Sequence, residues 1–160
     1  MSSSSDHTIA PVSEQDLEEL LRLMRAYCDF YEVEPSDARL LALSRTLIAD
    51  PEREGVQLLA RDAQASAVGF ASVFWSWDTT VASRIGIMND LFVAPRARGS
   101  GLAEALIEAS LQRCAMRGAV RLEWQTAPDN VRAQTVYERV GGERGPWISY
   151  TKQVGGSAGA

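Results

Sequence analysis

A loop carrying two arginines and two glycines joins a strand-like segment to a long helical pattern. The strand-like segment is 84–93, the helical pattern spans 99–117, and Arg-Ala-Arg-Gly-Ser-Gly fills 96–101 between them. The first N–H groups of a helix have no partner inside the helix, and the helix dipole adds positive potential there. Arginines contribute fixed charge, and glycines let the backbone approach a ligand closely. The loop therefore predicts a phosphate-binding turn, and the alternative is a glycine-containing loop with solvated arginines.

The segments around this loop predict an α/β fold of the mixed α+β kind. The strand–helix–strand unit 84–126 favours a parallel pair of strands, and the strands before it favour an antiparallel meander. We therefore expect a mostly antiparallel mixed sheet with helices on both faces. Hydrophobic periodicity predicts helices over 12–32, 36–49, 99–117 and 129–140, and strands over 56–62, 65–78, 84–93, 119–126 and 146–154.

Length and charge narrow the class of protein. The chain has 160 residues, which favours one domain over about 9–153 with flexible tails at 1–8 and 154–160. A formal net charge of −5 argues against general nucleic-acid binding. No apolar run approaches the ~20 residues of a membrane span, and the N-terminus does not resemble a secretory signal. We therefore expect a cytoplasmic protein with neither a membrane nor a nucleic-acid partner.

Histidine and cysteine usage limits the available chemistry. His7 is the only histidine and lies in the polar N-terminal stretch. Cys28 and Cys114 each fall in an apolar helical pattern, which predicts two buried reduced thiols. This leaves little room for a histidine-based triad or a zinc site, so we predict no metal. Chemistry must then depend on carboxylates, tyrosine, backbone amides or a cofactor.

Two spaced motifs resemble those of a known family. The first is [QR]-x-x-G-x-[GA], present from Arg96 to Gly101. The second is Asn-x-x-Ala-x-x-x-Tyr-x-x-x-Gly, present from Asn130 to Gly141. Together they resemble the GNAT superfamily of acetyl-CoA-dependent N-acetyltransferases, over about 9–153. The stretch 68–93 further resembles the diamine and thialysine acetyltransferase branch.

The resemblance implies a GNAT-like fold with a splayed parallel central pair of strands, acetyl-CoA as co-substrate, and direct transfer of acetyl to an amine. The pantetheine arm would pair with the edge of the fourth strand as an added strand. The pyrophosphate would bind the amides of about 98–103. The implied cofactor-binding residues are Leu91, Phe92, Val93, Arg96, Arg98, Gly99, Ser100, Gly101, Leu102, Ala103, Asn130, Ala133 and Tyr137.

The resemblance also suggests catalytic residues, because the attacking amine must lose a proton and the thiolate benefits from one. Tyr137 occupies the position of the tyrosine that protonates the CoA sulfur, although its helical spacing also suits a core tyrosine. The diamine branch usually has a Glu-Asp pair where this chain has Asn89 and Asp90, and in a strand these two face opposite sides. Asp90, Glu123 and a water chain from Asn89 are the candidates for the base, and Asp90 also suits a structural carboxylate.

The acceptor site is the least defined part of the sequence. By resemblance, Tyr31 and Trp75 would shape an amine pocket with Asp90 and Glu123, although large aromatics more often pack in cores. We expect a small-molecule amine such as a polyamine, a diamine or an amino-acid-like compound. The alternatives are peptide or protein N-acetylation and a non-catalytic acyl-CoA sensor. The segment 146–154 suits either closure of its own sheet or a homodimer interface.

Overall fold

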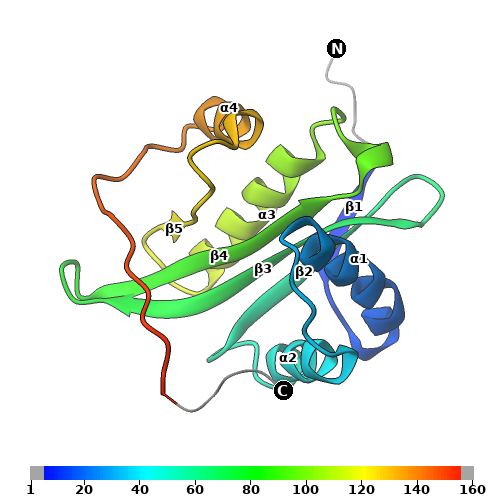
Figure 1. Cartoon of the computed structure of the whole chain (residues 1–160), viewed down its shortest axis with the longest axis horizontal. Coiled ribbons are helices and arrows are strands. Elements are labelled where there is room, and N and C mark those ends of the chain that lie inside the picture. The colour runs from blue at the N-terminus through cyan, green and yellow to red at the C-terminus, as the bar shows by residue number, and fades with distance from the viewer. Residues whose placement is uncertain (1–5, 156–160) are drawn as a thin grey trace.

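The computed structural model describes residues 6–155 and centres on one five-stranded mixed sheet (Figure 1). The strand order is β1-β2-β3-β4-β5, antiparallel throughout except for the parallel pair β4–β5. This architecture confirms the predicted fold class. The strands are β1 (Thr8–Pro11), β2 (Gly55–Arg61), β3 (Ala67–Asp78), β4 (Ser83–Val93) and β5 (Leu122–Glu123).

Helices cover both faces of the sheet and bury two separate apolar clusters (Figure 1). On one face, α1 packs against β3 and α2 against β2. On the other face, α3 packs against β2, β3 and β4, with α4 alongside it. The helices are α1 (Leu17–Phe30), α2 (Asp37–Ala49), α3 (Leu102–Met116) and α4 (Val131–Arg139), and short 3₁₀ turns span η1 (Glu14–Asp16) and η2 (Pro95–Ala97).

Side-chain capping marks the start of η1, which leads directly into α1, and the start of α2. The Ser13 N–H donates to Asp16 Oδ2 at 2.8 Å, as in a capping box. Ser36 caps α2 by accepting from the Arg39 N–H at 3.3 Å.

Both cysteines are free and buried, as predicted. None of the described helices is long and apolar enough to cross a membrane.

Three predicted segments at the ends of the chain are wrong. The expected strand over 119–126 shrinks to the two residues of β5, and the expected strand over 146–154 does not form. The side chains of Trp147 and Tyr150 are 90% and 91% exposed there, because the short β5 offers almost no edge for pairing. Conversely, Thr8 was expected in the N-terminal tail but begins β1, which pairs with β2. Residues 6–7 and 154–155 of the predicted tails form no helix or strand, and 1–5 and 156–160 lie outside the described residues.

A β-bulge interrupts β4 beside the point where β5 leaves the sheet. Met88 pairs with Val73 and Asp90 pairs with Ser72, so Asn89 is an extra residue without a partner on β3. Asn89 is exposed, whereas Asp90 is half-buried and neighbours α1. Side chains therefore do not alternate strictly between the two faces of the sheet at this point. The bulge places the Asn89 side chain at the opening between β4 and β5, with Asp90 behind it.

Candidate active site

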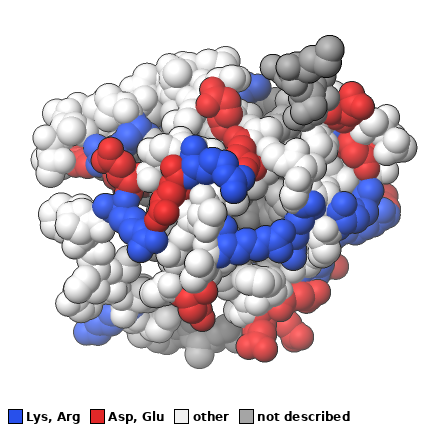
Figure 2. Space-filling model, turned by 90° about the horizontal axis from the view of Figure 1, so that it is seen from above, with Lys and Arg blue, Asp and Glu red and all other residues white. Residues whose placement is uncertain are grey.

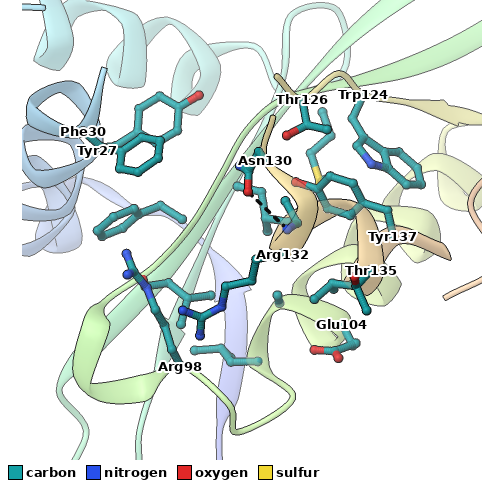
Figure 3. Close-up of a pocket in the computed structure, with 18 of the residues that line it drawn as sticks. Tyr27, Phe30, Arg98, Glu104, Trp124, Thr126, Asn130, Arg132, Thr135 and Tyr137 are labelled. Carbon is teal, nitrogen blue, oxygen red and sulfur yellow. Dashed lines mark hydrogen bonds between the residues drawn. The ribbon is translucent and has the colours of Figure 1, made fainter. Parts of the chain in front are cut away.

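A cavity of about 590 Å³ lies where β4 and β5 diverge (Figure 3). The two strands pair only at Gly86 with Leu122 and at Ile87 with Glu123. Beyond this point the β5-facing edge of β4 lacks a strand partner within the described residues. Residues of α1, α3, α4 and the segment after β5 close the remaining walls. The cavity thus combines an open strand edge with the start of a helix.

The glycine-containing turn forms one end of this cavity. Gly99 and Gly101 adopt φ angles of 78° and 80°, and Gly101 is the N-cap of α3 without any side-chain capping bond. A Cβ atom added at either glycine would meet no atom within 4 Å, so the space above the turn is open. Uncapped N–H groups, positive φ and open space together fit a bound phosphate.

Two arginines face the cavity next to this turn. Arg98 comes from the loop and Arg132 from α4, and Figure 3 shows both guanidinium groups in the space between those elements. Arg98 donates from Nε to the Val93 carbonyl at 3.1 Å. Within residues 6–155, neither arginine pairs with an acidic side chain, whereas Arg139 pairs with Glu104 at 2.9 Å. Two uncompensated cations in one cavity fit a polyphosphate group.

Two residues of the predicted phosphate turn point elsewhere. Arg96 pairs with Asp62 at 2.9 Å, and the Ser100 hydroxyl donates to the Ala97 carbonyl at 2.6 Å. Neither lines the cavity. From above, basic side chains form a band across the molecule with acidic ones around it (Figure 2).

Tyr137 projects from α4 into the middle of the cavity. Its ring meets the indole of Trp124 edge-on at 5.5 Å between centroids, and Figure 3 shows its hydroxyl on the side of the ring away from Trp124. Burial raises the pKa of Tyr137, and the nearby Tyr31 phenol adds to this effect. The group therefore stays protonated at neutral pH and is available as a proton donor.

Asn130 fixes the start of α4 beside Tyr137. Its Oδ1 accepts from the Ala133 N–H at 3.2 Å, and both residues line the cavity. Asn130 is therefore the N-cap of α4. The capping bond leaves the Asn130 side-chain amide group free to donate toward the cavity.

An aromatic cluster on α1 forms the wall opposite Tyr137. The Tyr27 and Tyr31 rings lie 5.0 Å apart, and the Phe30 and Tyr31 rings 5.1 Å apart. Tyr27 donates its hydroxyl to the Asn89 carbonyl at 3.3 Å. Burial and the adjacent Asp90 carboxylate raise the pKa of Tyr27, so its hydroxyl stays protonated. Tyr27 was not predicted from sequence, although it lies one helical turn before Tyr31.

The predicted acidic and aromatic substrate residues mostly lie outside the cavity lining. Asp90 accepts from the Asn89 side-chain amide at 3.2 Å and sits behind it. Glu123 accepts from Arg121 Nε at 2.7 Å, and Trp75 donates from Nε1 to the Pro51 carbonyl at 2.8 Å. None of the three lines the cavity.

The structure thus brings together most, but not all, of the predicted site residues. Those that line the cavity are Tyr31, Asn89, Leu91, Phe92, Val93, Arg98, Gly99, Gly101, Leu102, Ala103, Asn130, Ala133 and Tyr137. Sequence analysis missed Arg132, which lies two residues after Asn130 in the second motif. It also missed Gln125 and Thr126, which carried no signal because a continuing strand was expected there. Within the described part of the chain, no group of three or more metal-binding side chains is present.

Comparisons with known proteins agree with this fold. Residues 17–142 match the Acetyltransferase (GNAT) family. The chain is 31% identical over 121 residues to the uncharacterized N-acetyltransferase YhfO of Bacillus subtilis, covering 76% of this chain and 79% of that protein. It is 29% identical over 134 residues to the D-amino-acid N-acetyltransferase HPA3 of Saccharomyces cerevisiae, covering 82% of each. A crystal structure of a probable acetyltransferase superposes with a TM-score of 0.76 at 28% identity, covering 92% of this chain and 97% of that one.

The family match, together with the splayed sheet and the open turn before α3, identifies an acyltransferase of the acetyl-CoA-dependent class. The chain belongs to the Acetyltransferase (GNAT) family. Acetyl-CoA is the co-substrate of this family, and the open turn with its uncompensated arginines fits the phosphates of that molecule. The resemblance to the diamine and thialysine branch finds no support in these comparisons.

Proposed function

We propose that this protein transfers acetyl directly from acetyl-CoA to a primary amine of a small molecule. The observation that carries the proposal is the position of Tyr137, whose ring lines the same cavity as the phosphate-binding turn and the aromatic wall of α1. A proton donor there lies between a site for the phosphates and a separate compartment for an acceptor. In this proposal, the same cavity binds both acetyl-CoA and the acceptor amine.

The chain's own residues supply binding and orientation for the cofactor. Bound acetyl-CoA supplies an acetyl thioester, whose carbonyl carbon the amine attacks as the C–S bond breaks. The turn at Gly99 to Gly101 and the guanidinium groups of Arg98 and Arg132 would hold the phosphates. The unpaired edge of β4 at 91–93 would hold the pantetheine arm by backbone pairing.

Tyr137 acts as the general acid in this proposal. Its hydroxyl donates a proton to the sulfur, and it regains one from the amine nitrogen after the C–N bond has formed. Burial keeps the Tyr137 phenol protonated until that moment by raising its pKa. Proton donation to a leaving group typically contributes ~10²- to 10⁴-fold to a rate.

Asp90 is the proposed proton acceptor for the incoming ammonium, reached through Tyr27. The carboxylate lies outside the cavity lining, but it adjoins the Tyr27 hydroxyl, which does line the cavity. A proton leaving the ammonium can pass to the Tyr27 oxygen while the Tyr27 proton passes to Asp90. Glu123 is disfavoured for this role because it pairs with Arg121 outside the cavity.

The acceptor candidates come from resemblance. The diamine and thialysine branch suggests a diamine or polyamine, and the relative HPA3, named a D-amino-acid N-acetyltransferase, suggests an amino-acid-like amine. A peptide or protein acceptor is the alternative to a small-molecule amine, and membership of the acetyltransferase family disfavours a non-catalytic acyl-CoA sensor. A homodimer formed through the exposed segment 146–154 also remains a prediction.

A thiol-release assay tests the proposal. Acetyl-CoA would be offered with primary amines of varied size and charge, and the acetylated product would be identified by mass spectrometry. The proposal predicts stoichiometric thiol and acetylamine. A sensor would instead bind acetyl-CoA by calorimetry and release no thiol with any amine.

A further inference from the structure

The two ends of the cavity differ in charge. Its four charged lining residues, Arg98, Glu104, Arg132 and Arg139, all come from the loop before α3 or from α3 and α4. The other end is formed by α1, the β4 bulge and the segment after β5. The side chains that line that end are neutral: Tyr27, Phe30, Tyr31, Asn89, Gln125 and Thr126.

This distribution of charges provides no anionic partner for the second ammonium group of a diamine or polyamine. Glu104 is the only acid that lines the described cavity, and Arg139 already pairs with it at 2.9 Å. Asp90 supplies one carboxylate behind Asn89 and Tyr27, which matches one ammonium group. A diamine or polyamine would bring at least one further charge into a compartment with no anion to receive it, at a cost in desolvation.

The aromatic wall offers a different kind of contact. Phe30 and Tyr31 are 64% and 50% exposed although both line the cavity, so a large part of each side chain is open to solvent. Exposed rings of this kind can be covered by an apolar or aromatic ligand body, and their faces also attract a single ammonium. Tyr31 and Tyr137 line the same cavity, so the Tyr31 ring shares the space of the proposed reaction centre.

We propose that the acceptor is a primary monoamine carried on an aromatic or apolar body. The inference rests on the proposed function and narrows its acceptor. The amine would reach the space between Tyr31 and Tyr137, and its body would cover the exposed rings of α1. The neutral end of the cavity disfavours the polyamine acceptor that the sequence resemblance suggests.

Matched amines separate charge from aromatic contact. n-Butylamine and 1,4-diaminobutane have the same chain length and differ by one ammonium, while 2-phenylethylamine adds a ring. The expected order of kcat/KM is 2-phenylethylamine at least ~10-fold above n-butylamine, and n-butylamine above 1,4-diaminobutane. A diamine rate equal to or above that of n-butylamine would overturn the inference alone. No turnover with any amine, with acetyl-CoA binding intact, would overturn the proposed function and the inference with it.

Variants supply a second readout. Tyr31→Leu is expected to lower the ratio of kcat/KM for 2-phenylethylamine over n-butylamine, and to weaken calorimetric binding of 2-phenylethylamine to the CoA complex. Trp77→Leu is the matched control, because Trp77 is 67% exposed on β3 and lies outside the cavity lining. Asn89→Glu would add the missing carboxylate and is expected to raise kcat/KM for 1,4-diaminobutane. An unchanged ratio in Tyr31→Leu would show that the rings do not contact the acceptor.

Discussion

The ring of Tyr137 packs edge-on against the indole of Trp124, with centroids 5.5 Å apart and an interplanar angle of 74°. This contact holds the phenol in place without using its hydroxyl. Tyr137→Phe should therefore keep the packing and remove only the proton donor. We predict that turnover falls at least ~10-fold in a thiol-release assay while acetyl-CoA binding and Tm stay the same.

A tyrosine-to-phenylalanine substitution outside the cavity tests whether the loss of any tyrosine hydroxyl would lower turnover. Tyr150→Phe removes the hydroxyl of a side chain that is 91% exposed and lies outside the cavity. It should leave turnover unchanged. Equal rates for Tyr137→Phe and the wild-type protein would remove Tyr137 from the mechanism.

Gly101→Val should abolish acetyl-CoA binding. The added side chain would occupy the open space above the turn, where a phosphate would approach the start of α3. Gly118→Val is the matched control, because Gly118 also has a positive φ, of 69°, and open space around it but lies beyond the C-terminus of α3. Calorimetry should show lost binding only in Gly101→Val. Equal binding by the two variants would contradict the assigned phosphate site.

Arg132→Ala should weaken CoA binding by about 10-fold, the size expected for one hydrogen bond to a charged group. The guanidinium lines the cavity and has no acidic partner among the described residues, so the free protein loses little when it is removed. Arg22→Ala changes the net charge equally on the exposed face of α1, where Arg22 pairs with Glu18. Titrations at two salt concentrations should show a smaller salt dependence in Arg132→Ala alone. Matching affinities in both variants would contradict a phosphate role for Arg132.

Asp90→Asn should slow acetylation at neutral pH and approach the wild-type rate at high pH. The proposed role of Asp90 is to accept a proton through Tyr27, and that role disappears once the amine is neutral near its ordinary pKa of ~10.4. Tyr27→Phe should show the same pH dependence, because the hydroxyl connects the cavity to the carboxylate. Asp129→Asn, on the exposed loop before α4, is the control. A rate defect that stays constant from neutral to alkaline pH would contradict the relay.

Asp78 is expected to make stability depend on pH at the end of the β3–β4 hairpin. Hydrogen bonds from Thr80 and Arg121 lower the pKa of Asp78 from 3.8 to about 2 in the folded protein. Its contribution is therefore complete above the unfolded pKa and is lost as the pH falls through the folded value. Asp78→Asn should lower Tm at pH 7, and the difference from wild type should narrow between about pH 4 and pH 2. A difference that does not change with pH would contradict this account.

The parts of the fold that sequence predicted well are those whose signals are local. Helix periodicity and the glycine turn are each contained within a few residues. β1 was missed because its four residues form a strand only by pairing with β2, more than forty residues later. The predicted strand over 146–154 has strand-like composition but finds no edge, since β5 ends at Glu123. Strand formation depends on partners that local composition does not specify.

The residues of the candidate site also divide into those with local sequence signals and those whose positions depend on the rest of the fold. The motif residues near the turn and on α4 gather in one cavity because each motif fixes its own local geometry. The acceptor end depends on the bulge at Asn89, which places Asp90 behind the wall and leaves Tyr27 in front of it. A one-residue irregularity in β4 cannot be located from alternation in the sequence. Tyr27 and Gln125 therefore became visible only in the structure.

The most direct test of the account is thiol release from acetyl-CoA with 2-phenylethylamine, measured for the wild-type protein and for Tyr137→Phe. The account predicts acetylated amine and free thiol in equal amounts from the wild type, with at least a ~10-fold lower rate in the variant. Acetyl-CoA that binds but yields no acetylated product with this or any other primary amine would contradict the assignment of acetyl transfer to this cavity.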